Sequence, residues 1–202
     1  DNVQHYCILK FVSRMGANIT SDTTLKKPVA GGEFEDVRMG SLWADSPVLV
    51  IVMRRPGCIL CREQTLAVWA EREKFEKLGV KLILTVHEWK QREIDAFAPE
   101  YWGGAVFYDP ERTFYAAVHG GSVKIASKLS LLNPFSTGFK NGRAAYKRGV
   151  VKDSNFTGNG VVLGGVLVFK AGGELVYSHA ESDFGVHPPM EDLIAGASKA
   201  AA

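Results

Sequence analysis

The stretch that decides the fold is VLVIVMRRPGCILC, residues 48–61. Its first six residues are apolar and rich in β-branched side chains, which predicts a strand buried on both faces, as in a parallel sheet. A Pro56-Gly57 turn follows, and the composition of residues 63–78 predicts a helix after that turn. Cys58 and Cys61 therefore stand where a buried strand passes into the start of a helix.

This position favours a reactive thiol, because the first turn of a helix has unpaired N–H groups and carries the positive end of the helix dipole. Arg54, Arg55 and Arg62 are close in the sequence, and we expect their guanidinium groups to favour the thiolate of Cys58 further. Cys61 is three residues on, within bonding reach on a helix. A C-x-x-C in an alternating strand and helix pattern is the thioredoxin-type redox signature. We interpret Cys58 as the more exposed nucleophile and Cys61 as the resolving thiol.

Two other interpretations of the thiols stay open at this point: inert structural cysteines, or half of a zinc site. Zinc would require two further ligands. The histidines show no close pair of ligands in the sequence; they are His5, His87, His119, His179 and His187. Cys7 is a single distant thiol among apolar neighbours, as is typical of a buried, unreactive cysteine. Redox chemistry is the favoured interpretation, and we expect no bound metal or cofactor.

The composition is that of an ordinary soluble globular protein, with 46% hydrophobic and 23% charged residues in a chain of 202. A net charge of +2 is too small to indicate nucleic acid or an anionic membrane as a partner. No apolar run is long enough to span a bilayer, and no signal peptide is visible after Asp1. Three cysteines favour a reducing compartment over a disulfide framework. We therefore expect a cytoplasmic protein, with an organelle as the alternative if a transit segment was removed before Asp1.

The rest of the chain continues the alternation of strands and helices. Further strands are predicted at residues 80–86, 105–108, 161–169 and 174–179, and helices at 88–98, ending at Pro99, and at 190–199. The first strand, helix and strand predict a right-handed βαβ unit, and the last two strands predict a hairpin. This order is the thioredoxin plan, an α/β fold with a central mixed sheet flanked by helices.

Two regions do not fit that plan. Residues 111–160 carry helical segments at 112–118, 124–132 and 138–148, which predict a helical insertion. Residues 1–33 are interpreted as an N-terminal extension, with a loop at 20–27, so that the thioredoxin-like domain covers residues 34–199.

Weaker signals lie outside the dithiol. His87 and Glu88 follow the second predicted strand. There His87 could transfer a proton to a departing alkoxide, and Glu88 could carry a proton without touching the substrate itself. The alternatives are an exposed loop histidine and an acid at a helix N-terminus. Lys140, Arg143 and Lys147 share a helical face, which is either a solvated face or one that attracts an anionic lipid carboxylate or an acidic reductase.

The segment RRPGCILCRE, residues 54–63, resembles the active-site segment of the peroxiredoxin-like proteins of the AhpC/TSA superfamily, a family that includes prostamide/prostaglandin F synthase. The resemblance covers about residues 34–199. It continues in Ser41-Leu42-Trp43, Leu78-Gly79-Val80, Glu88, Tyr108-Asp109, Phe114-Tyr115, Asn155-Phe156-Thr157-Gly158, Leu163-Gly164-Gly165-Val166 and Asp183-Phe184-Gly185.

The resemblance implies a thioredoxin-like oxidoreductase that reduces a peroxide or a lipid endoperoxide through Cys58 and Cys61. It also implies a thioredoxin-type reductant, with NADPH acting only upstream of that partner. The chain departs from a true peroxiredoxin at Arg55, where a Thr or Ser is expected, and at Gly164, where a second Arg is expected. Gly164 and Gly165 also occupy the region of the thioredoxin cis-Pro, where glycine lets backbone or substrate approach closely.

Arg54, Arg55 and Arg62 are then the candidate groups for polarising a peroxide in place of the missing Thr and Arg. Three functions remain in view. The first is reduction of a peroxide or endoperoxide. The second is reduction of protein disulfides without peroxidase activity. The third is a non-enzymatic redox sensor whose disulfide state alters partner binding.

Overall fold

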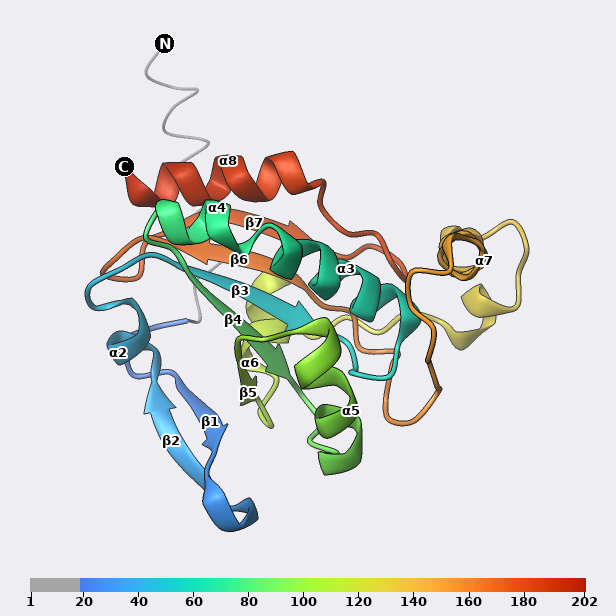
Figure 1. Cartoon of the computed structure of the whole chain (residues 1–202), viewed down its shortest axis with the longest axis horizontal. Coiled ribbons are helices and arrows are strands. Elements are labelled where there is room, and N and C mark those ends of the chain that lie inside the picture. The colour runs from blue at the N-terminus through green and yellow to red at the C-terminus, as the bar shows by residue number, and fades with distance from the viewer. Residues whose placement is uncertain (1–18) are drawn as a thin grey trace.

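The computed structural model describes residues 19–202, so the predictions for His5 and Cys7 lie outside the described residues. The chain folds around a seven-stranded sheet with strand order β2-β1-β5-β4-β3-β6-β7 (Figure 1). The strands are β1 (Thr24–Pro28), β2 (Phe34–Arg38), β3 (Val48–Met53), β4 (Lys81–Val86), β5 (Ala105–Tyr108), β6 (Gly165–Phe169) and β7 (Leu175–Ala180). β3, β4 and β5 are parallel, whereas β1, β2, β6 and β7 join by antiparallel pairing. The predicted mixed α/β sheet is confirmed.

Helices cover both faces of this sheet. They are α2 (Met39–Trp43), α3 (Ile59–Ala70), α4 (Arg72–Lys77), α5 (Gln91–Tyr101), α6 (Thr113–Val118), α7 (Thr137–Arg148) and α8 (Met190–Ala201), with 3-10 turns η1 (Ala30–Gly32) and η2 (Lys128–Leu131). The odd-numbered residues of β3 pack with α3, α4, α5 and α8, and the even-numbered residues pack with α2 and α6. All six residues of β3 are buried, which is the physical reason for its uninterrupted apolar run.

The structure corrects several predicted boundaries. The predicted loop at 20–27 was wrong, because residues 24–28 form β1, which pairs with β2 and β5. Strands of the sheet therefore lie on both sides of residue 33, the predicted end of the N-terminal extension. The helix predicted at 63–78 begins at Ile59 and is divided at Glu71, whose ψ of 9° leaves the helical region. Pro99 lies in the last turn of α5 instead of ending it, because a proline there removes only one helical hydrogen bond.

The segment predicted as a helical insertion has two parts. Its first helix, α6, packs into the core with Phe114, Tyr115 and Val118 buried. Only residues 128–131 of the helix predicted at 124–132 are helical, as η2, which packs against α7. In Figure 1, α7 lies beyond the N-terminal end of α3, away from the sheet. The strand predicted at 161–169 begins only at Gly165.

The helices are short. α3, α7 and α8 have 12 residues each. Within residues 19–202, no helix combines the length and the apolar character that crossing a bilayer would require.

Candidate active site around Cys58 and Cys61

The dithiol lies at the start of helix α3, just after strand β3. Cys58 is the N-cap residue of α3, with φ −81° and ψ 126°, and Cys61 follows within the first turn. Both cysteines are free thiols, as far as residues 19–202 are concerned. The predicted position at a helix start is confirmed.

Cys58 is the more exposed of the two thiols, as predicted, but both are buried: Cys58 is 5% exposed and Cys61 is 2% exposed. The cause is tertiary, because loops from distant parts of the chain cover the start of α3. The Asn155 backbone N–H donates to the Gly57 carbonyl at 2.9 Å, and Gly185 lies against the Leu60 side chain.

Arg54 is the residue that makes this burial compatible with a thiolate. Its Nη2 donates to the Cys58 Sγ over 3.3 Å, and its guanidinium lies 4.9 Å from the ring centroid of Phe184. Arg54 is itself 4% exposed, so water screens its charge little. Burial alone would lower the pKa of Arg54, but Cys61, Cys58 and Glu181 raise it above its usual value, so the guanidinium stays charged.

The two thiols have opposite acidities. The hydrogen bond from the Cys61 side chain lowers the pKa of Cys58 well below its usual value; burial opposes this, and the charge of Arg54 adds to it. The same hydrogen bond, together with burial, raises the pKa of Cys61 well above its usual value. Both directions, and the position of Arg54 against Cys58, favour Cys58 as the thiolate of the pair and Cys61 as the donor of their hydrogen bond.

Arg55 and Arg62 have other contacts. Arg55 Nη1 donates to the carbonyls of Asn155 at 2.5 Å and Thr157 at 3.2 Å, so it fixes a covering loop and contributes only a weaker charge effect to Cys58. Arg62 Nε donates to the Pro56 carbonyl at 2.7 Å, and its Nη1 pairs with Asp153 Oδ2 at 2.5 Å. The structure therefore does not bring Arg62 to the thiolate, contrary to the expectation from sequence proximity.

A buried acid that the sequence analysis missed completes the environment of Arg54. Glu181, 4% exposed, pairs with Arg54 Nε at 3.3 Å, and His187 Nε2 lies 3.0 Å from its other oxygen. Burial opposes ionisation of Glu181, but His187 and Arg54 together hold its pKa below the usual value. The only sequence signal nearby is the Asp183-Phe184-Gly185 motif, and a single acid after a strand has no pattern of its own.

The two glycines before β6 serve the backbone of the sheet. A Cβ on Gly164 would lie 1.8 Å from the Val52 carbonyl oxygen, and one on Gly165 would lie 2.1 Å from that of His179. The Gly164 N–H donates to Glu181 Oε2 at 2.9 Å. Of the two expected reasons for glycine here, close approach of backbone is the one that the structure contains.

His87 and Glu88 follow strand β4 and lie near the turn that Arg54, Arg55 and Pro56 begin. His87 Nε2 is 3.1 Å from the Asn159 carbonyl, so that nitrogen is the donor, and burial lowers the pKa of His87, which keeps it neutral. Glu88 accepts from the Asn159 N–H at 2.7 Å and pairs with Lys90 at 3.0 Å. Both residues hold the loop at 155–160, and their side-chain hydrogen bonds within residues 19–202 go to Asn159 and Lys90, not to a cysteine.

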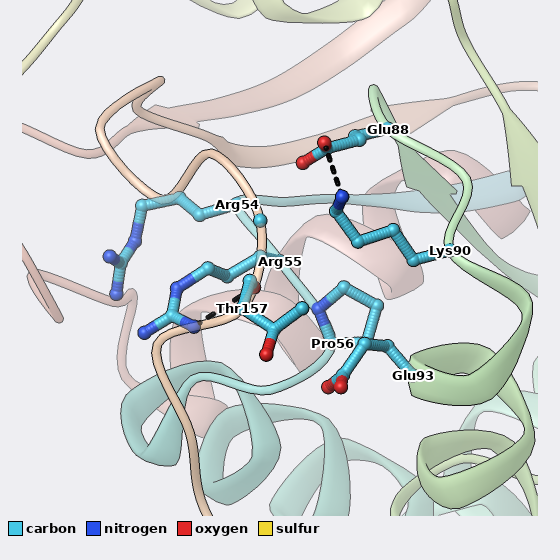
Figure 2. Close-up of a pocket in the computed structure, with 8 residues that line it drawn as sticks. Arg54, Arg55, Pro56, Glu88, Lys90, Glu93 and Thr157 are labelled. Atoms are coloured by element: carbon cyan, nitrogen blue, oxygen red, sulfur yellow. Dashed lines mark hydrogen bonds and ion pairs between the residues drawn. The ribbon is translucent and has the colours of Figure 1, made fainter.

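A small pocket opens beside this turn. Its empty space is about 220 Å³, including open solvent, and it is lined by Arg54, Arg55, Pro56, Glu88, Lys90, Glu93, Thr157 and Gly158. Figure 2 shows the two arginine side chains on one side of the pocket and the Glu88–Lys90 ion pair on the other. Most of this space is open to solvent and the enclosed part holds about one water molecule, so the pocket by itself indicates no ligand. Across residues 19–202, no group of three or more His, Cys, Asp and Glu side chains is placed to hold a metal ion.

Comparison with known proteins places this chain in a family. The sequence model described as AhpC/TSA antioxidant enzyme matches residues 67–183, more than half of the chain. Peroxiredoxin-like 2A of Xenopus tropicalis is 31% identical over 180 residues, which cover 88% of this chain and 74% of that protein. The chain belongs to the AhpC/TSA family.

The family membership confirms the resemblance seen in the sequence. Peroxiredoxin-like 2A of Rattus norvegicus is 33% identical over 146 residues, and the chain covers 59% of that relative's length. Peroxiredoxin Q of Xanthomonas campestris has a TM-score of 0.55 and 14% identity, covering 91% of this chain and 94% of its own. The reduced 2-Cys peroxiredoxin of Plasmodium vivax has a TM-score of 0.53 and 9% identity, covering 88% and 90%. These solved structures share the thioredoxin-like fold with this AhpC/TSA chain.

Proposed function

We propose that this protein is a thiol-dependent oxidoreductase that reduces a peroxide through Cys58 and Cys61 and is restored by a thioredoxin-type dithiol. The observation that carries the proposal is the guanidinium of Arg54, whose Nη2 lies 3.3 Å from the Cys58 sulfur at the start of α3, with the second thiol, Cys61, in the first turn of the same helix. Membership of the AhpC/TSA family supports the same class of chemistry.

The chemical step balances with the groups in the site. The Cys58 thiolate attacks one oxygen of a hydroperoxide ROOH; the S–O bond forms, the O–O bond breaks, and the Cys61 thiol protonates the departing alkoxide to ROH. Cys58 is then a sulfenic acid and Cys61 a thiolate. The Cys61 thiolate attacks the Cys58 sulfur, the disulfide forms, and hydroxide leaves and takes a solvent proton. A dithiol partner returns the two electrons, with NADPH acting upstream of it.

Arg54 is the group that takes over peroxide polarisation in this proposal. Arg55 is engaged with two loop carbonyls and Arg62 with Pro56 and Asp153, so Arg54 is the one of the three that contacts sulfur. The burial of Cys58 favours a small peroxide as substrate. A lipid endoperoxide is a further candidate, for which the covering loop at 155–160 would have to move.

Reduction of protein disulfides is the second candidate, favoured by one observation. The Thr or Ser position of a peroxiredoxin is Arg55, whose donors are already used on Asn155 and Thr157, and disulfide exchange needs no such donor. The 5% exposure of Cys58 opposes this candidate, because a folded protein disulfide requires an accessible sulfur.

One assay separates the candidates. NADPH oxidation is followed with thioredoxin and thioredoxin reductase, using hydrogen peroxide, an alkyl hydroperoxide, a prostaglandin endoperoxide or insulin as substrate. We expect turnover of a hydroperoxide that is lost in Cys58→Ser and reduced in Cys61→Ser, with Cys7→Ser as the matched control. Turnover of insulin alone would select the disulfide reductase. Turnover of no substrate would contradict both and favour the redox sensor.

A further inference from the structure

The low net charge of the chain is distributed unevenly. Residues 119–152 contain seven lysines and arginines and no Asp or Glu. The remaining chain therefore has 17 basic and 22 acidic residues, a net charge of −5. The seven are Lys124, Lys128, Lys140, Arg143, Lys147, Arg148 and Lys152, and all are exposed. Within the described part of the chain, Arg148 is the one of them that forms an ion pair, with Glu63.

Large apolar side chains protrude from the same segment. Ile125, Leu129, Leu132 and Phe135 are 67%, 71%, 76% and 83% exposed. Four such residues within eleven positions are more than the scattered single apolar residues expected of a protein surface. Leu129 lies in η2, Leu132 and Phe135 follow it, and Ile125 precedes it in an isolated bridge to Val162; η2 packs against α7.

Polar contacts fix which sides of η2 and α7 face the body of the protein. Ser130 Oγ donates to Asp183, the Gly138 N–H donates to Asp183 Oδ2 at 3.0 Å, and Asn141 Nδ2 donates to the Phe184 carbonyl at 3.0 Å. Lys140, Arg143 and Lys147, at positions i, i+3 and i+7, then lie on the outward side of α7. These hydrogen bonds hold the segment against the body of the protein, with its basic and apolar side chains turned to solvent.

We propose that this surface, the outward sides of η2 and α7 from Ile125 to Lys147, docks on the anionic headgroups of a lipid bilayer. Uniform positive charge without acids matches the uniform negative charge of such a membrane. Separate protruding side chains enter a soft acyl boundary without a preformed pocket, and lysines beside them can reach the headgroups. An acidic protein would match the charge but would also have to provide pockets for Leu129, Leu132 and Phe135.

The docking surface is connected to the dithiol. Asp183 and Phe184, which hold η2 and α7, belong to the loop whose Phe184 ring packs on Arg54, and Arg54 donates to Cys58. Docking therefore places the dithiol end of the molecule beside the leaflet. Peroxides that form beside an anionic leaflet follow as the substrate class; a lipid hydroperoxide among them would also require the covering loop at 155–160 to move, and this last step rests on the proposed peroxide reduction.

The test is co-sedimentation of the full chain with vesicles of phosphatidylcholine alone and of phosphatidylcholine mixed with phosphatidylserine. We expect binding to the mixed vesicles only, weakened by added salt. Each basic side chain near an anionic surface contributes about fivefold to partitioning, so Lys140→Gln/Arg143→Gln/Lys147→Gln should bind about 100-fold more weakly. Leu132→Ser/Phe135→Ser should lose about tenfold or more.

Matched controls make the result specific. Lys77→Gln/Arg92→Gln/Lys199→Gln removes three exposed charges elsewhere and should bind like the unmodified chain. Cys58→Ser should also bind normally, so a failure of peroxide reduction leaves this test intact. Equal binding to both kinds of vesicle, equal losses in the control triple variant, or sedimentation with neither vesicle would overturn the proposal; in the last case a protein partner would be the better occupant.

Discussion

The charge of Arg54 is expected to set the reactivity of Cys58. Arg54→Met removes that charge and replaces the arginine with an unbranched, uncharged side chain. Nη2 and Sγ are 3.3 Å apart, and both side chains are buried. At an effective dielectric constant of about 20, two unit charges at this distance attract by about 5 kcal/mol. One pKa unit corresponds to about 1.4 kcal/mol, so the upper limit of the shift is about 3 to 4 units.

The expected shift is smaller than this limit, about 2 units upward, because the positive charge is spread over the guanidinium and the Cys61 hydrogen bond remains. The assay is the rate of iodoacetamide alkylation as a function of pH, in the chain with Cys7→Ser. Around neutral pH, alkylation of Arg54→Met should be about 10- to 100-fold slower. Removing Arg54 also leaves Glu181 without its cation, so Arg54→Met/Glu181→Gln separates the two effects.

Arg54→Lys provides the control for folding, because it keeps a charge at the site while losing the planar guanidinium. It should retain part of the depressed pKa of Cys58, with circular dichroism confirming that each variant is folded. An alkylation profile in folded Arg54→Met/Glu181→Gln that coincides with that of the parent chain would refute the electrostatic reasoning.

Three further outcomes follow from the same structure. Arg62→Met should lower the free energy of unfolding by about 2 to 3 kcal/mol in urea titrations, because it leaves the buried Pro56 carbonyl unpaired. The same substitution should leave the pKa of Cys58 nearly unchanged. A large shift in the pKa of Cys58 would instead place Arg62 at the thiolate. Gly164→Ala should lower the free energy of unfolding by about 3 kcal/mol or more, measured by thermal unfolding, because the added Cβ clashes with Val52. Gly142→Ala has open space at that position in α7 and should raise the free energy of unfolding by about 0.5 to 1 kcal/mol. Equal effects of the two substitutions would contradict the close packing of β6 on β3. The depressed pKa of Cys58 stabilises the folded chain fully above the pKa of the thiol in the unfolded chain, about 9, and this stability is lost as the pH falls through the pKa in the folded chain. The free energy of unfolding should therefore rise with pH towards 9 more steeply in the parent chain than in Cys58→Ser. Parallel curves for the two chains would count against a stabilised thiolate.

The position of the dithiol at a helix start could be predicted from the sequence, because the sequence patterns that indicate it lie within one short stretch. An apolar run, a Pro-Gly turn and a helix-favouring stretch within 31 residues place Cys58 and Cys61 at a helix start, and the structure confirms this placement. The order of strands and helices was also readable, because hydrophobic periodicity is set over windows of a few residues. Boundaries failed where tertiary pairing overrides composition, as in β1, whose polar sequence Thr24–Pro28 is a strand because it pairs with β2 and β5.

The choice among the three arginines lay beyond the sequence. Arg54, Arg55 and Arg62 are all within four residues of Cys58, but long-range partners decide where each guanidinium goes: Glu181 and Phe184 for Arg54, Asn155 and Thr157 for Arg55, and Asp153 for Arg62. Glu181 itself had no local signal, since its role depends on its ion pair with Arg54, more than a hundred positions away in the sequence.

The sequence by itself determined a buried parallel strand followed by a helix that begins at a dithiol, because backbone geometry and burial patterns repeat over short distances. The tertiary structure alone decided that both sulfurs are covered and that Arg54 is the cation beside Cys58. The physical reason is that these properties depend on charges and hydrogen bonds across a low-dielectric interior, and those distances exist only once the chain between residues 54 and 187 has folded.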